Sequence, residues 1–149
     1  MENFRWPQMS EDELTAFLGQ GGTGVISFST SSDDPPYSTP VSYGFSTDVK
    51  HFHFRLALPP GSEKEARLAQ PVSFVTHSQT DEGWRSVIAT GSLEDLTNEP
   101  HESSAIQERW GVDIPLVDIF EAAPADLTFR QFRLVPEELT GRKQVSSSE

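Results

Sequence analysis

Basic and hydroxyl side chains gather on both sides of a Pro-Pro-Gly turn at residues 59–61. Arg55 lies in the stretch before this turn, and Ser62 and Lys64 come shortly after it. Ser62 is followed three residues later by Glu65, a capping-box pattern that predicts the start of a helix. Unpaired N–H groups at a helix N-terminus, a serine hydroxyl and two cations together suit a phosphate group. The simpler alternative is that Ser62 only caps the helix and Arg55 is a surface residue.

A second stretch, residues 36–44, could contact a flat ring. It reads Pro-Tyr-Ser-Thr-Pro-Val-Ser-Tyr-Gly and alternates like a strand, but Pro40 has no N–H to donate to a ladder. We therefore expect this strand to lie at a sheet edge or to be interrupted at Pro40. An interrupted strand leaves backbone donors and acceptors free for a heteroaromatic ring. A proline on an edge strand with no ligand is the commoner arrangement.

A third stretch, residues 83–91, reads Gly-Trp-Arg-Ser-Val-Ile-Ala-Thr-Gly. It is typical of a strand, with Arg85 and Ser86 early in it and a glycine where another backbone could approach closely. The alternative is an inward-facing aromatic residue beside a surface arginine.

The overall charge restricts what these residues can bind. The 149-residue chain carries 23 Asp and Glu against 11 Lys and Arg, a formal net charge of −12 at pH 7. Such a charge repels phosphate backbones, so a broad nucleic-acid interface is not expected. Abundant acid with few lysines suits a high-salt cytosol, or else marks an ordinary acidic protein. The chain has no cysteine and no apolar stretch typical of a signal peptide at its start, and we expect a cytoplasmic protein.

The elements that must position these residues are mostly short strands. Alternating and β-branched patterns predict six of them, at residues 25–30, 37–46, 51–58, 72–77, 84–93 and 127–135. Three helices are predicted, from Ser10 to Gly19, from Ser62 to Pro71 and over residues 99–110. The sequence predicts a single domain over residues 1–143 and a disordered tail over residues 144–149.

The order and spacing of these stretches resemble the pyridoxamine 5′-phosphate oxidase-like superfamily, most closely its nitroimidazole-resistance-type branch. The likeness rests on Pro-Tyr and Pro-Val-x-Tyr in residues 36–43, a Phe-His strand leading to a helix-start lysine in residues 52–64, and Ser-Val-x-x-x-Gly in residues 86–91. It covers residues 10–96 well and the C-terminal third loosely. The resemblance implies a mainly β fold, a Greek-key FMN-binding split barrel of about six strands with short flanking helices.

The resemblance also implies which residues hold the cofactor, FMN. The phosphate contacts carry over to Arg55, Ser62 and Lys64. The contacts to the isoalloxazine ring fall on the backbone and side chains near Val41, Ser42 and Tyr43, and on Arg85 and Ser86. Members of the family are usually homodimers with the flavin between subunits, so Trp84 or Arg142 is expected to come from the second subunit.

Three classes of function remain open, the last of them a protein whose pocket holds no redox cofactor. The first is an FMN-dependent oxidoreductase acting on an unidentified small molecule, with Arg85 near the N1/O2 edge of the ring to stabilise the reduced flavin. Oxidation of vitamin B6 is not expected, because the substrate-phosphate residues are not evident around the Arg-Leu-Val-Pro segment at residues 133–136. The alternative is a non-catalytic flavin or haem binder. A haem would need an axial ligand from the four histidines, His51, His53, His77 and His101.

Two pairs of residues have simpler interpretations. His51 and His53 share a strand face at a spacing that can hold a metal, but no third ligand stands nearby in the sequence, and such pairs are usually exposed. We therefore expect no metal site. The acidic pair Glu137 and Glu138 is interpreted as solvated charge.

Overall fold

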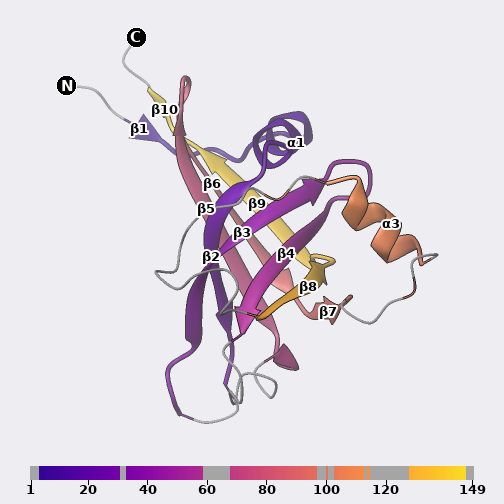
Figure 1. The fold of residues 1–149 in the computed structure, drawn as a ribbon. Helices are drawn as coiled ribbons and strands as arrows, with labels where there is room; N and C mark the ends of the chain where they lie inside the picture. The colour runs from indigo at the N-terminus through magenta and orange to yellow at the C-terminus, as the bar shows by residue number, and fades with distance from the viewer. Residues whose placement is uncertain are drawn as a thin grey trace.

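The computed structural model describes residues 4–30, 33–58, 68–96, 100, 103–112, 114 and 128–146. Its strands are β1 Phe4–Arg5, β2 Gly22–Phe28, β3 Tyr37–Ser46, β4 His51–Leu58, β5 Val72–Thr80, β6 Gly83–Gly91, β7 Leu93–Asp95, β8 Thr128–Leu134, β9 Glu138–Lys143 and β10 Val145–Ser146. Its helices are α1 Glu11–Leu18 and α3 Ser104–Trp110. Eight strands form one antiparallel sheet in the order β7-β8-β4-β3-β2-β5-β6-β9, and β1 pairs with β10. Figure 1 shows this sheet curled around its core, with α1 at one end and α3 beside the turn between β3 and β4.

Aromatic side chains fill the concave side of the sheet. Phe52 and Phe54 stack with ring centroids 6.1 Å apart, and Phe74 meets Phe54 edge-on at 4.9 Å. All three are fully buried, and burial of each stabilises the fold by roughly 1.5–3 kcal/mol. Because strand side chains alternate between faces, His53 and Arg55 of the same strand must lie on the convex face, which we call the outer face.

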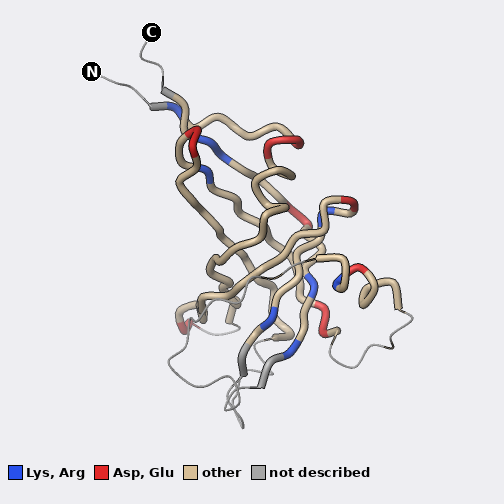
Figure 2. The backbone as a smooth tube through the Cα atoms, turned by 45° about the horizontal axis from the view of Figure 1, so that its top comes forward, with Lys and Arg blue, Asp and Glu red and all other residues tan. Residues whose placement is uncertain are grey.

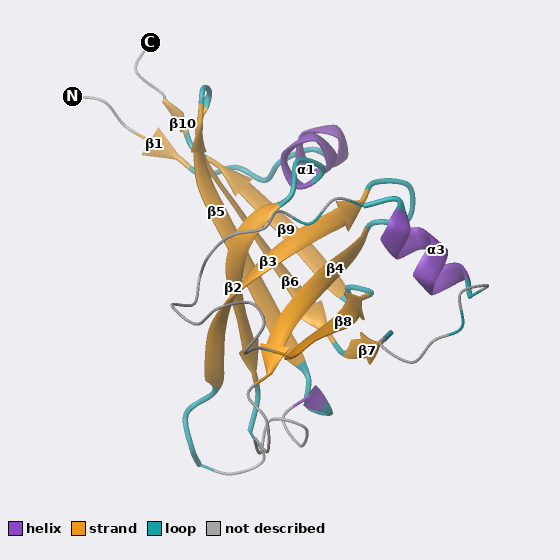
Figure 3. Cartoon of the chain, in the orientation of Figure 1, coloured by secondary structure: helices purple, strands orange, loops and turns teal. Residues whose placement is uncertain are grey.

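Helix α1 closes one end of the barrel, and its predicted capping box is confirmed. The Glu13 N–H donates to Ser10 Oγ at 3.2 Å, and the Ser10 N–H donates to Glu13 Oε1 at 3.0 Å. Leu14 packs so tightly on β9 that a Cβ at Gly141 would lie 2.6 Å from its side chain. A larger residue at Gly141 would therefore push the ends of the Leu14 and Met9 side chains aside. The helices and strands can be followed in Figure 3.

The predicted fold class is confirmed, with more strands than the sequence patterns indicate. All six predicted strands are present, but β7 and β9 extend the main sheet. Strand β9 includes Glu138, a glycine and two basic residues, which are poor strand formers, and pairing with β6 from Glu138 to Lys143 holds it in place. Residues Val145–Ser146 pair with Phe4–Arg5, so this part of the predicted disordered tail is ordered.

The two remaining helix predictions meet different outcomes. Helix α3 begins at Ser104 rather than near residue 99, because the Ser103 side chain accepts the Ile106 N–H and caps it. The helix predicted after Ser62 lies mostly outside the described residues. No helix in the described parts of the chain is long and apolar enough to cross a membrane.

Two ladders of the main sheet end before their strands do. The β3–β4 ladder ends at Ser42 opposite Arg55, although β3 continues back to Tyr37. The β2–β5 ladder ends at Val25 opposite Val75, although β5 continues to Thr80. We call the gaps beyond these pairs the β3–β4 opening and the β2–β5 opening.

Pro40 lies at the β3–β4 opening. Strand β3 is an interior strand between β4 and β2, so the prediction that it lies at a sheet edge is wrong. The predicted interruption is confirmed on one side only. Pro40 still pairs with Val25 of β2, whereas the ladder with β4 stops two residues away, at Ser42.

Candidate flavin site

The strand register aligns several of the predicted contact residues on the outer face. Arg55 on β4 lies opposite Ser42 on β3, and Ser86 on β6 lies opposite Arg142 on β9. Residues opposite each other in a ladder present their side chains on the same face. Four residues from distant parts of the sequence therefore share one surface, in two pairs separated by β2 and β5.

Arg55 differs from the basic residues that hold the fold together. It is half-buried, and it makes no hydrogen bond or ion pair with any residue that the structure describes. Arg130 and Arg133, by contrast, pair with the carboxylates of Asp95 and Glu94 on the neighbouring strand. Figure 2 shows basic residues mainly along the strands and acidic residues mainly on helices and turns. A half-buried guanidinium without a nearby carboxylate is well placed to bind an anionic ligand.

On this outer face Ser42, Ser86 and Trp84 add uncharged groups, and Arg142 adds another cation. Ser42 is 9% exposed next to Arg55, and Arg142 donates to the Trp6 carbonyl oxygen at 3.2 Å. Trp84 is 40% exposed, with its ring 5.9 Å from that of His77.

Three predicted contact residues face the interior. The side chains of Val41 and Tyr43 lie in the core, each residue being 2% exposed. A ligand on the outer face could therefore reach only the backbone of these two residues. Burial raises the pKa of the Tyr43 phenol, and a hydrogen bond between this phenol and the Thr76 side chain partly opposes this shift.

Arg85, the third, belongs to an ion-pair network at the end of the barrel under α1. Its Nη2 lies 2.6 Å from Glu82 Oε2 and 3.6 Å from Glu13 Oε2, and its side chain is 12% exposed. Glu13 also accepts a hydrogen bond from Lys143 Nζ at 2.6 Å. The hydrogen bonds from Lys143 and then Ser10 lower the pKa of Glu13 from 4.5 to about 2. Arg85 is thus engaged by acids, unlike Arg55.

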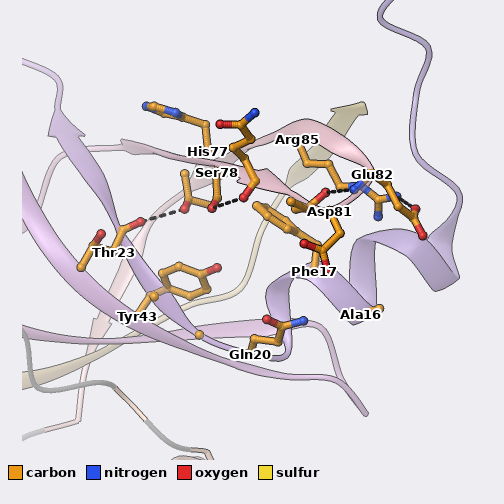
Figure 4. Close-up of a pocket in the computed structure, with 15 residues that line it drawn as sticks. Ala16, Phe17, Gln20, Thr23, Tyr43, His77, Ser78, Asp81, Glu82 and Arg85 are labelled. Carbon is orange, nitrogen blue, oxygen red and sulfur yellow. Dashed lines mark hydrogen bonds and ion pairs between the residues drawn. The ribbon is translucent and has the colours of Figure 1, made fainter. Parts of the chain in front are cut away.

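A cleft of about 570 Å³ opens beside this network, and Figure 4 shows its walls. It is lined by the α1–β2 connection, the ends of β2 and β5 and the β5–β6 turn. Tyr43 and Arg85 are the only two of the predicted contact residues among its described lining residues. Of the described predicted residues, Tyr43 and Arg85 thus lie at this cleft, Val41 faces the core, and the others lie on the outer face.

The histidine pair of β4 forms a contact that sequence reasoning missed. His53 is fully buried rather than exposed, and its Nε2 lies 2.7 Å from Glu108 Oε2 of α3. His51 Nδ1 lies 3.0 Å from the other oxygen, and Arg133 lies 3.5 Å from the same carboxylate. Burial lowers the pKa of His53, which outweighs the opposing effect of Glu108. The contact docks α3 on the sheet, and within the described residues no group of His, Asp or Glu has a metal-site arrangement.

Two predicted phosphate contacts, Ser62 and Lys64, lie outside the described residues. Of the predicted phosphate site only Arg55 is described, at the end of β4 from which the chain continues toward them.

Comparison with known proteins agrees with this architecture. The chain is similar in structure to the FAD binding protein from Mycobacterium smegmatis, with a TM-score of 0.63 and 20% identity over 93% of this chain and 99% of that chain. A FAD-binding protein from Mesorhizobium loti has a TM-score of 0.62 and 22% identity over 96% and 99% of the two chains. A putative 5-nitroimidazole antibiotic resistance protein from Bacteroides thetaiotaomicron has a TM-score of 0.61 and 14% identity over 97% and 90%. At such identities the likeness shows the fold.

Sequence comparisons give the family. No curated protein matches the chain significantly. The family model described as pyridoxamine 5′-phosphate oxidase matches residues 10–143, nearly the whole chain. The chain therefore belongs to the pyridoxamine 5′-phosphate oxidase family.

Proposed function

We propose that this protein binds FMN on the outer face of its sheet, at the β3–β4 opening, and acts as an oxidoreductase on a small molecule. The observation that carries the proposal is Arg55, a half-buried cation without an acidic neighbour among the described residues, in a chain of net charge −12. Its place beside an interrupted ladder supplies both a positive charge and free backbone groups.

The residues of this chain would then bind and orient the cofactor. Arg55, with Ser62 and Lys64 further along the chain, would hold the phosphate, and the backbone near Val41 and Ser42 would hold the ring edge. The flavin, when bound, supplies the capacity to accept and donate electrons. Tyr43 and the core beneath β3 hold the strand rigid, so that the backbone groups stay in place.

A second copy of the chain would complete the site. Arg55 and Arg142 are separated by five strand spacings, about 24 Å along the sheet, which is more than one FMN spans. Arg142 and Trp84 could therefore reach a cofactor that is bound mainly by another copy. A row of apolar residues, Val25, Val75 and Ile88, crosses the outer face, and Val25 and Ile88 are 42% and 48% exposed. Such a row favours association with a second subunit.

The spectrum of the purified protein tests the cofactor. Flavin absorbance that bleaches under NADH, NADPH or dithionite and returns in air supports a redox flavoprotein, and identification of the released molecule separates FMN from FAD. A colourless protein that does not bind added FMN, or a haem spectrum instead, would contradict the proposal. Light scattering tests the second subunit, and a monomer with full flavin occupancy would contradict that part.

A further inference from the structure

At the β2–β5 opening, backbone groups on both walls have no partner in a neighbouring strand. Beyond Val25 and Val75 the two strands separate, while each continues to pair with its other neighbour. One side-chain bond bridges the gap, from Thr76 Oγ1 to the Thr23 carbonyl oxygen at 2.8 Å. In an antiparallel strand the N–H of a residue points to the same side as its C=O, so the Thr23 N–H also faces the gap.

The cleft at this opening has the size of a small-molecule site. Its volume of about 570 Å³ lies within the usual range for such sites, roughly 300–1,000 Å³. Figure 4 shows the rings of Tyr43 and Phe17 and the amide of Gln20 around the space. The Nε of Arg85 is buried and has no hydrogen-bond partner among the described residues. The cleft thus combines aromatic surface with unused hydrogen-bonding groups.

Its charges disfavour an anion. Asp81 and Glu82 line the cleft with Arg85, and the guanidinium of Arg85 is already paired with Glu82 and close to Glu13. A phosphate or carboxylate would meet more negative than positive charge here. A neutral ring with N–H and C=O groups along one edge would suit both the unpaired backbone and the charge.

We propose that the β2–β5 opening is a binding site for a neutral, planar heterocycle with alternating N–H and C=O groups on its edge. This site differs from the β3–β4 opening: Thr76 and Tyr43 line it from the concave side of the sheet, and it lies at the Tyr43 end of β3, whereas the β3–β4 opening lies beyond Ser42 toward Tyr37. The proposal does not depend on whether the protein binds flavin.

Three pyrimidine probes test the proposal by NMR titration of the protein as isolated and after saturation with FMN. Uracil carries the required edge, 1,3-dimethyluracil lacks the N–H donors, and orotate adds a negative charge to the same ring. We expect uracil to shift the backbone amide signals of residues 22–24 and 76–80, with and without FMN. Both other probes should bind at least about tenfold more weakly than uracil.

Two variants locate the site. Ser78→Phe places a large ring at an exposed residue of the cleft wall and should weaken uracil binding at least about tenfold, whereas Gln107→Phe, on an exposed position of α3, should not. Absence of uracil shifts up to its solubility limit would overturn the proposal, as would orotate binding as tightly as uracil. Uracil binding that survives Ser78→Phe, or that disappears on FMN saturation, would show that the site is elsewhere or is the flavin site itself.

Discussion

At both openings of the sheet a ladder between two strands is interrupted, but the charges of the surrounding side chains differ. At the β3–β4 opening, Arg55 has no acidic neighbour among the described residues. At the β2–β5 opening, Arg85 is held by Glu82 and Glu13, and Asp81 adds further negative charge. Both arginines are predicted cofactor contacts, but Arg55 lies on a strand that borders its opening, whereas Arg85 lies on β6, next to β5.

The neighbours of each arginine account for this difference, since Arg133 lies on the same face as Arg55 but is paired with Glu94 and Glu108. Arg55 alternates with buried phenylalanines and lies on the outer face, where an anion can reach it. Arg85 lies on the side of the buried Val87, under α1, where acids from the helix and the turn already neutralise it. The first opening therefore suits a phosphate-bearing cofactor and the second a neutral ring.

The largest expected effect is on flavin affinity. Arg55→Met should weaken FMN binding about tenfold to a hundredfold, because a charge-assisted contact contributes about 1.5–3 kcal/mol. Arg85→Met should leave FMN affinity within about threefold of the wild-type value, because Arg85 faces the interior. Fluorescence titration with FMN measures both variants. Equal losses in the two would remove the distinction between the openings.

For stability we expect the substitution of Arg85 to have the larger effect and that of Arg55 the smaller. Arg85→Met should lower the free energy of unfolding by about 1–2 kcal/mol, because it removes contacts of a largely buried guanidinium with two carboxylates. Arg55→Met should change it by less than about 0.5 kcal/mol, since no described residue pairs with Arg55. Urea unfolding gives both values. A stability loss in Arg55→Met as large as that in Arg85→Met would mean that Arg55 is structural.

A smaller effect on stability is expected when the pH is lowered, because of Glu13 in α1, at the end of the barrel. The pKa of Glu13 is about 2 in the folded protein against 4.5 ordinarily, so the unfolded chain takes up this proton first. The contribution of Glu13 to stability is therefore complete above pH 4.5 and is lost as the pH falls toward 2. Glu13→Gln should flatten the stability curve in that interval, measured by urea unfolding against pH. Asp12→Asn, in the same turn of α1, is the matched control, and an equal flattening there would contradict the assignment.

The smallest effect is expected from salt. Screening shortens the Debye length from ~10 Å at 0.1 M to ~3 Å at 1 M, which weakens repulsion among the excess carboxylates more than it weakens the fewer ion pairs. The melting temperature should therefore rise modestly between low and molar KCl. A melting temperature that stays flat or falls would remove the support for a high-salt cytoplasm.

The sequence predicts the local elements of this fold better than its long-range contacts. Alternation identifies the six longer strands, and the Ser10–Glu13 pattern identifies the start of α1, because both signals are local. Strands β7 and β9 have no such signal, since their pairing with β8 and β6 comes from the folded sheet. The same holds for Glu108, which lies 55 residues from His53 in the sequence and contacts it only once α3 docks.

The sequence predicts which residues belong to the candidate site better than it predicts where their side chains lie. Because side chains along a strand alternate between its two faces, Val41 and Tyr43 point to the other face of the strand from Ser42. The three side chains therefore cannot all contact one ligand on one face. The pairing of Arg55 with Ser42 depends on strand register, which hydrophobic patterning and turns set together. The paired state of Arg85 depends on Glu13 of α1, a contact between distant segments.

A crystal structure of the protein with FMN would show directly which opening of the sheet holds the cofactor. We expect the FMN phosphate within hydrogen-bonding distance of the Arg55 guanidinium, with the ring against the outer face of β3 near Ser42. FMN in the cleft beside Arg85, or bound with its phosphate away from Arg55, would contradict it.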